Sequence, residues 1–149
     1  MPKSTPFGFE NLANFYDMAT KTLAAYFTRG HSNAEMRACM LQFEADFKEN
    51  LTFNNGHVEE WFCDNHGEYA AKSMDAFLQE HGSRQSFIVP WNPQQNPAER
   101  GNQIILRPLR IILASSNATV RVWPFIASQI CLVHNSLSNR SATAILPGR

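Results

Sequence analysis

The stretch PWNPQQNPAERGNQ, residues 90–103, connects a predicted strand to a predicted helix. A strand-like run from Gln85 to Val89 leads into it, and closely spaced prolines and asparagines then end that strand. A helical pattern begins at Pro97, so Glu99 falls in the first turn of the predicted helix. The stretch therefore predicts a carboxylate at the start of a helix, near the end of a strand.

The composition is typical of one globular domain. The chain has 149 residues, of which 44% are hydrophobic and 17% charged, which is enough for a sizeable core. We expect one domain over residues 1–137 and a C-terminal tail over 138–149. No apolar run approaches the ~18 residues that span a bilayer, and no apolar signal core follows Met1. We therefore expect a soluble, intracellular protein with no membrane partner.

The cysteines give no sign of a disulfide framework or a zinc site. Cys39, Cys63 and Cys131 are odd in number and widely separated, so we expect buried thiols in a reducing compartment. Cys63 and His66 have zinc-like spacing, but no second pair matches them. We expect His66 to be a loop histidine without a metal.

Charge is divided unevenly along the chain. Residues 1–83 carry 6 Lys/Arg and 12 Asp/Glu, whereas residues 84–149 carry 7 and 1, so the two parts have net charges of −6 and +6. All seven basic residues of the second part are arginines, and the planar guanidinium suits phosphate. Two interpretations stay open: the second part binds a polyanion, or the two parts neutralise each other within one fold.

The apolar pattern predicts an α/β order of elements. Ser32 and Glu35 form a capping box, and Gly82 can take a left-handed cap after a helix. In the helix that begins at Pro97, Ile105, Leu109 and Ile112 share one side. The predicted elements are strands 7–16 and 20–28 as a hairpin, helix 32–50, strand 58–63, helix 70–80, strand 84–89, helix 97–114 and helix 122–136.

Two acids follow predicted strands, and ligands collect at such strand ends in α/β sheets. Asp64 follows the strand 58–63, and Glu99 follows the strand 84–89. Two such carboxylates can share hard divalent cations, and a pair of Mg²⁺ ions supports phosphodiester chemistry. Spacing alone leaves open that each acid is a solvated surface charge. The sequence contains neither a G-x-S-x-G elbow nor a glycine-rich phosphate loop.

Several motifs together resemble the integrase core of copia-type LTR retrotransposons, which is related to retroviral integrases. The motifs are Asp64-Asn65-His66-Gly67-Glu68-Tyr69, Pro90-Trp91-Asn92-Pro93-Gln94-Gln95-Asn96 and Ala98-Glu99-Arg100, with Phe77-Leu78-x-x-His81-Gly82 between them. Trp123-Pro124 and His134-Asn135 extend the resemblance forward, and Asn14-Phe15-Tyr16-Asp17 and Tyr26-Phe27 extend it backward. The resemblance therefore covers nearly the whole chain.

The resemblance implies an RNase H-like fold, a mixed sheet flanked by helices. It also implies polynucleotidyl transfer, the joining of retroelement ends to target DNA, with two Mg²⁺ or Mn²⁺ ions held by three acids. By position, Asp64 and Glu99 are the second and third acids. The helix after Glu99 is expected to face DNA. The expected partners are DNA and further copies of the chain, with no small-molecule substrate and a nuclear location. The expected DNA-binding residues are Arg100, Gln103, Arg107 and Arg110.

The chain also departs from the family pattern. The family's first acid lies on an opening central strand ahead of the Phe9 to Tyr16 strand, and this chain starts after that point, so we expect that strand and ligand to be missing. Asp17 matches a different family acid and does not replace it. The step from Asp64 to Glu99 is one residue shorter than usual, His66 stands where glycine is usual, and Pro108 interrupts a helix.

These departures leave two hypotheses about function. In the first, the chain is an integrase-type enzyme core that is inactive as given, because its first catalytic acid is missing. In the second, it is a catalytically silent fragment of a decayed retroelement that retains only DNA or protein binding. The arginine-rich helix is common to both.

Overall fold

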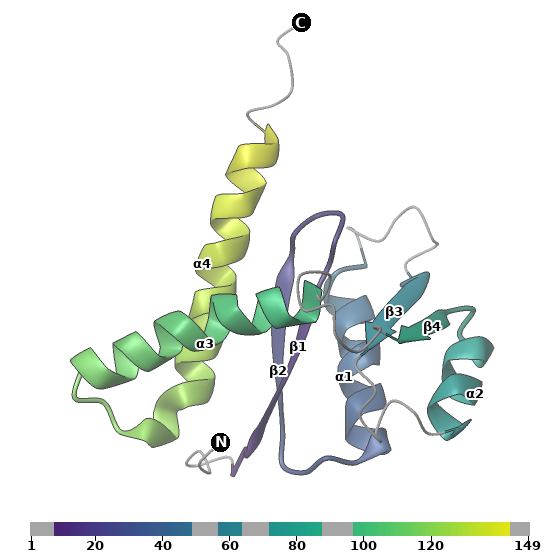
Figure 1. The fold of residues 1–149 in the computed structure, drawn as a ribbon, viewed down its shortest axis with the longest axis horizontal. Helices are drawn as coiled ribbons and strands as arrows, with labels where there is room; N and C mark the ends of the chain where they lie inside the picture. The colour runs from purple at the N-terminus through teal and green to yellow at the C-terminus, as the bar shows by residue number, and fades with distance from the viewer. Residues whose placement is uncertain (1–7, 49–56, 64–71, 88–96, 144–149) are drawn as a thin grey trace, which may run out of the picture. The chain divides into compact units, whose positions relative to one another are not determined.

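The computed structural model describes residues 8–48, 57–63, 72–87 and 97–143 (Figure 1). Its elements follow the predicted α/β order. The chain forms two compact units, one made of residues 1–29 and 99–149 and the other of residues 30–98. The assignment of residues 1–137 to one domain stays a prediction. The elements are β1 (Asn11–Tyr16), β2 (Leu23–Thr28), α1 (Asn33–Asp46), β3 (Glu60–Cys63), α2 (Lys72–Glu80), β4 (Arg84–Phe87), α3 (Pro97–Ser115), the 3₁₀ helix η3 (Val120–Val122) and α4 (Trp123–Thr143).

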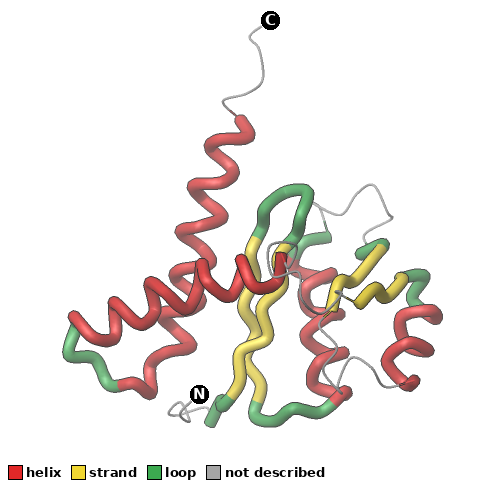
Figure 2. The backbone as a smooth tube through the Cα atoms, viewed as in Figure 1, coloured by secondary structure: helices red, strands yellow, loops and turns green. Residues whose placement is uncertain are grey.

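The first unit begins with the predicted antiparallel hairpin. β1 pairs with β2 in a register that sets Asn11 opposite Thr28 and Tyr16 opposite Leu23. The Asp17 carboxylate closes the turn between them, because Oδ1 accepts a hydrogen bond from the main-chain N–H of Ala19 at 2.9 Å. Figure 2 shows the two strands as yellow tubes that run side by side. The hairpin prediction is confirmed, although both strands start later than predicted.

Helices α3 and α4 pack on this hairpin and build its core. Leu23 from β2, Ile105 from α3, and Ala127 and Cys131 from α4 are all buried in one cluster. Trp123, at the start of α4, is also buried and meets the ring of Phe27 edge-on at 5.3 Å. Each Å² of apolar surface that is removed from water stabilises the fold by about 25 cal/mol. The burial of these apolar side chains therefore stabilises the unit.

The second unit contains a β-α-β arrangement covered by α1. β3 and β4 pair in parallel, with α2 as the connection between them. Phe43 of α1 packs edge-on against Trp61 of β3 at 5.8 Å. The capping box of Ser32 and Glu35 is present at the start of α1, and Gly82 after α2 has a φ of 71°. Both predictions of helix ends are confirmed.

The described strands form an antiparallel pair and a parallel pair, each a separate two-stranded sheet. Antiparallel and parallel pairing are the two components of a mixed sheet, and helices flank both pairs, as the α/β fold class predicts. The missing first strand stays a prediction. Among the described residues, no helix is both long and apolar enough to cross a membrane.

The predicted end of the last helix was wrong. Helix α4 continues to Thr143, so residues 138–143 are helical where we expected the start of a frayed tail. The sequence there has no proline or glycine to stop a helix. On the apolar side of α3, Ile105 and Leu109 are buried, whereas Ile112 is 38% exposed. Residue 7 and residues 49–50, 70–71 and 88–89 of the predicted elements lie outside the described residues.

Candidate functional site

The first turn of α3 carries the candidate catalytic acid. Glu99 lies in that turn and its side chain is exposed. The first N–H groups of a helix have no intrahelical partner, and the helix dipole adds partial positive charge at this end. A carboxylate is therefore favoured here, and its hard oxygen atoms are the donors that Mg²⁺ prefers.

A polar face runs along α3 from the residue after Glu99. Spacings of three and four residues place its members on one side of the helix, and all of them are exposed. The opposite side is buried at Gly101, Ile105 and Leu109. These side chains therefore form an accessible surface, which we call the arginine face, and DNA binding by it stays a prediction. It consists of Arg100, Gln103, Arg107 and Arg110.

The predicted metal site also includes a second acid, which follows β3. Asp64 follows β3 directly but lies outside the described residues. Within the parts of the chain that the structure describes, no group of three His, Cys, Asp or Glu side chains could hold a metal ion. Glu99 fits a Mg²⁺ or Mn²⁺ ion by the chemistry of its oxygens. One carboxylate does not make a site, so the metal site stays a prediction.

Asp17 has a different role from a metal ligand. Besides its bond from Ala19, its carboxylate accepts a hydrogen bond from the main-chain N–H of Thr20 at 3.3 Å. An aspartate that accepts hydrogen bonds from the residues just after it stabilises a tight turn. This local use agrees with our reading that Asp17 does not replace the first catalytic acid.

The two compact units differ sharply in charge. Residues 30–98 contain four Lys/Arg and ten Asp/Glu, a net charge of −6. Residues 1–29 and 99–149 contain nine and three, a net charge of +6. The two units therefore differ in net charge as much as residues 1–83 and 84–149 do, although residues 1–29 belong to the basic unit and residues 84–98 to the acidic one. The arginine face belongs to the basic unit, whose field attracts polyanions.

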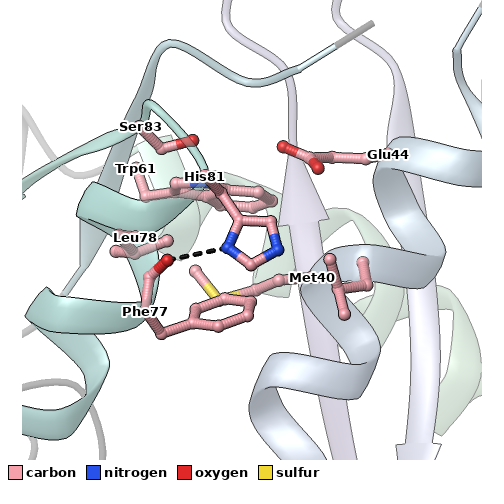
Figure 3. A pocket seen from close by; sticks show the side chains of 8 residues that line it. Met40, Glu44, Trp61, Phe77, Leu78, His81 and Ser83 are labelled. Atoms are coloured by element: carbon pink, nitrogen blue, oxygen red, sulfur yellow. Dashed lines mark hydrogen bonds between the residues drawn. The ribbon is translucent and has the colours of Figure 1, made fainter.

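A small pocket lies within the acidic unit, between α1, β3, α2 and the turn before β4 (Figure 3). His81 Nδ1 lies 2.8 Å from the carbonyl oxygen of Phe77, so Nδ1 carries the proton and Nε2 is an acceptor in the neutral ring. The Ser83 hydroxyl donates to the carbonyl of Val58 at 2.6 Å. None of the predicted site residues lines the pocket. Its lining consists of Met40, Leu41, Glu44, Trp61, Phe77, Leu78, His81 and Ser83.

All three cysteines are buried and unpaired by disulfides, as predicted. Burial raises the pKa of the Cys131 thiol to about 11. Burial, and secondarily the charge of Glu35, raises the pKa of the Cys39 thiol. A raised pKa keeps the thiol protonated and unreactive. Burial therefore makes Cys39 and Cys131 poor candidates for a nucleophile.

The fold has counterparts among solved structures. The chain is similar to a chain of the simian T-cell lymphotropic virus intasome in complex with PP2A regulatory subunit B56 gamma, with a TM-score of 0.62 and 17% identity; the similarity covers 83% of this chain and 45% of that one. It is also similar to the catalytic core domain of BIV integrase, with a TM-score of 0.54, 13% identity, and 83% and 78% of the two chains covered. The third is the HTLV-2 integrase catalytic core domain in complex with magnesium, in a trimeric form, with a TM-score of 0.58, 12% identity, and coverage of 83% and 80%.

The chain has the fold of retroviral integrase catalytic cores. No protein-family profile matches the sequence, and no curated protein matches it. The integrase-like fold is therefore detected by structure, in agreement with the resemblance read from the motifs.

Two residues that hold α3 and α4 against the hairpin were not predicted from the sequence. Gly101 lets the helix approach the hairpin closely, and the only sequence signal was a glycine inside a helical pattern. Asn135 of α4 binds the main chain of Leu23 in β2. Its membership of the His134-Asn135 motif gave no hint of that partner.

Proposed function

We propose that the chain is the core of a copia-type LTR retrotransposon integrase, a polynucleotidyl transferase that acts on DNA ends. The observation that carries the proposal is the arrangement of α3 within an integrase-like fold: Glu99 stands in its first turn, directly before the exposed arginine face. An acid and a row of guanidinium groups on one helix suit a reaction at phosphodiesters.

The chemistry assigned to the acids is metal binding. Glu99 and Asp64 would hold Mg²⁺ or Mn²⁺, which when bound activates a hydroxyl nucleophile and stabilises the leaving oxygen. Glu99 is accessible to the ion and lies at the favourable end of a helix. We propose that a third acid, which the resemblance places on a strand ahead of β1, is also needed. The joining of DNA ends should therefore depend on all three acids.

The arginine face would hold the DNA backbone beside the acids. Arg100, Arg107 and Arg110 are exposed on one side of α3, and guanidinium groups bind phosphate in a bidentate manner. Phosphate contacts fix the position of a duplex without reading its sequence. This face would therefore align a DNA end with Glu99 whatever its sequence.

The experiment that tests DNA binding uses the salt dependence of affinity. Fluorescence anisotropy of a labelled duplex gives the binding constant across a salt series, and each lost phosphate contact lowers the slope by about 0.9. The triple variant Arg100→Ala, Arg107→Ala, Arg110→Ala should lose a slope of about 3. Arg121→Ala is a control, since Arg121 is exposed but lies in η3. An unchanged slope in the triple variant would contradict the proposal.

The proposed enzymatic activity is tested by a strand-transfer assay, which measures the joining of DNA ends. A chain extended at its N-terminus by a strand that ends in aspartate should join DNA ends only with Mg²⁺ or Mn²⁺, and Glu99→Gln should abolish this activity. Activity that survives Glu99→Gln would refute the assigned role of Glu99. Mg²⁺-dependent activity of the 149-residue chain itself would refute the need for a third acid.

The alternative is a silent DNA-binding module. The arginine face is built by α3 alone and does not depend on the acids, so DNA binding can persist without catalysis. In that case Asp64→Asn and Glu99→Gln leave DNA affinity unchanged, and the extended chain stays inactive. The integrase proposal also includes a homo-oligomer and a nuclear location. Light scattering on the purified chain measures its mass and so tests for the homo-oligomer.

A further inference from the structure

Gly101 is a glycine inside α3, where glycine is less favourable than alanine because it loses more backbone freedom. It is buried, while its neighbours Arg100 and Asn102 are exposed. A destabilising residue at a buried helical position indicates that space, and not helix propensity, determines the choice. The question is what fills that space.

The hairpin fills it. A Cβ atom added to Gly101 would lie 2.8 Å from Nδ2 of Asn14, 3.3 Å from Cδ1 of Leu23 and 3.3 Å from Cβ of Tyr16. The amide of Asn14 is the end of a flexible side chain and can turn away. The Cβ of Tyr16 is bonded to the main chain and moves only with the strand. The α3 backbone therefore approaches both strands more closely than a residue with a side chain permits.

The hairpin also cannot easily retreat from a larger residue. Leu23 is fully buried, and its N–H and C=O are each bonded to the side chain of Asn135 at 2.9 Å. Interiors are close-packed, so a new methyl group must displace something. Because β2 is held at Leu23, the displacement falls on the first turn of α3.

We propose that Gly101 is the positioning residue for Glu99. Glu99 lies two residues earlier in the same turn, so the depth at which Gly101 seats α3 on the hairpin sets the position of the Glu99 carboxylate relative to β1. This inference rests on the proposed role of Glu99 as a metal ligand. It adds that the ligand is placed by a contact on the opposite side of its helix.

The test compares Gly101→Ala with Asn102→Ala, a change at the next position, which is exposed. Mn²⁺ affinity is measured by electron paramagnetic resonance of the full chain, with Glu99→Gln as the reference for loss of the ligand. Removing a residue that orients a metal ligand typically weakens binding 10- to 100-fold. We expect Gly101→Ala to weaken Mn²⁺ binding about tenfold and Asn102→Ala to leave it unchanged. Adding Asn14→Ala to Gly101→Ala should restore part of the affinity.

The outcomes separate this inference from the proposed function. If Glu99→Gln weakens Mn²⁺ binding but Gly101→Ala does not, Gly101 has only a packing role and the inference fails alone. If Glu99→Gln has no effect, the proposed metal role fails and the inference falls with it. If Gly101→Ala does not fold, both changes are compared in a Pro108→Ala background.

Discussion

The side-chain amide of Asn135 pairs with both main-chain groups of Leu23, which lies 112 residues earlier in the chain. Its Oδ1 accepts from the N–H of Leu23, and its Nδ2 donates to the C=O of Leu23, both at 2.9 Å. One amide of α4 thus binds the main chain of β2 as a neighbouring strand would. The pairing joins the last helix to the hairpin at the centre of the basic unit's core.

Asn135→Ala should therefore destabilise the fold. Leu23 is fully buried, so its N–H and C=O lose their partners with little access to water. We expect a loss of about 1–3 kcal/mol in the free energy of unfolding, measured by urea denaturation. Ser136→Ala is the control, because the Ser136 hydroxyl donates to the carbonyl of Leu132 within the same helix at 2.8 Å. Equal losses in the two variants would contradict the argument.

Because the Cys131 thiol is buried, the free energy of unfolding should depend on pH in the alkaline range. Burial raises its pKa from the ordinary thiol value of 9.0, which the exposed side chain of the unfolded chain should have, to about 11. Between these values the unfolded chain has released the proton and the folded chain retains it, so stability falls as the pH rises from about 9 to about 11. Cys131→Ala should remove this part of the slope. Urea denaturation at pH 8, 9, 10 and 11 measures it, and parallel pH curves for the two proteins would refute the prediction.

Pro108 should limit the stability of α3. It lies inside the helix, where its ring lacks an N–H donor and clashes with the carbonyl of Ile104, four residues earlier. Pro108→Ala should raise the free energy of unfolding by up to about 3 kcal/mol. Pro124→Ala should give no comparable gain, because Pro124 is the second residue of α4 and needs no intrahelical donor. No stabilisation in Pro108→Ala would indicate that packing of the ring offsets its backbone effect.

Local chemistry explains which parts of the fold the sequence predicts well. The capping box at Ser32, the stop at Gly82 and the spacing of the arginine face each depend on residues a few positions apart. Such features are fixed by helix geometry, so a sequence pattern is sufficient to find them.

Contacts between distant residues explain what could not be predicted. The pairing of Asn135 with Leu23 and the approach of Gly101 to Tyr16 depend on where separate elements meet. A periodic sequence pattern does not predict such a contact, because a single residue makes it and no repeated spacing accompanies it. The division into two compact units has the same origin, since it follows from which strands pair.

Glu44 in the acidic unit also makes contacts that a sequence pattern does not predict. It is charged and lies next to Phe43 in α1, yet only 8% of it is exposed. Its Oε1 accepts from the main-chain N–H of Val58 at 2.9 Å, and its Oε2 lies 3.2 Å from Nδ1 of His57. The carboxylate thus ties α1 to the chain just before β3.

Glu44→Ala should leave the N–H of Val58 without its acceptor and lower the free energy of unfolding by about 1–3 kcal/mol. Glu44→Gln is the matched control, because its amide oxygen can still accept from Val58 and its amide nitrogen can donate to a neutral His57. We expect the glutamine variant to retain most of the stability in urea denaturation at pH 8. If the two variants lose equal stability, the negative charge of Glu44 matters and the hydrogen bond to Val58 does not.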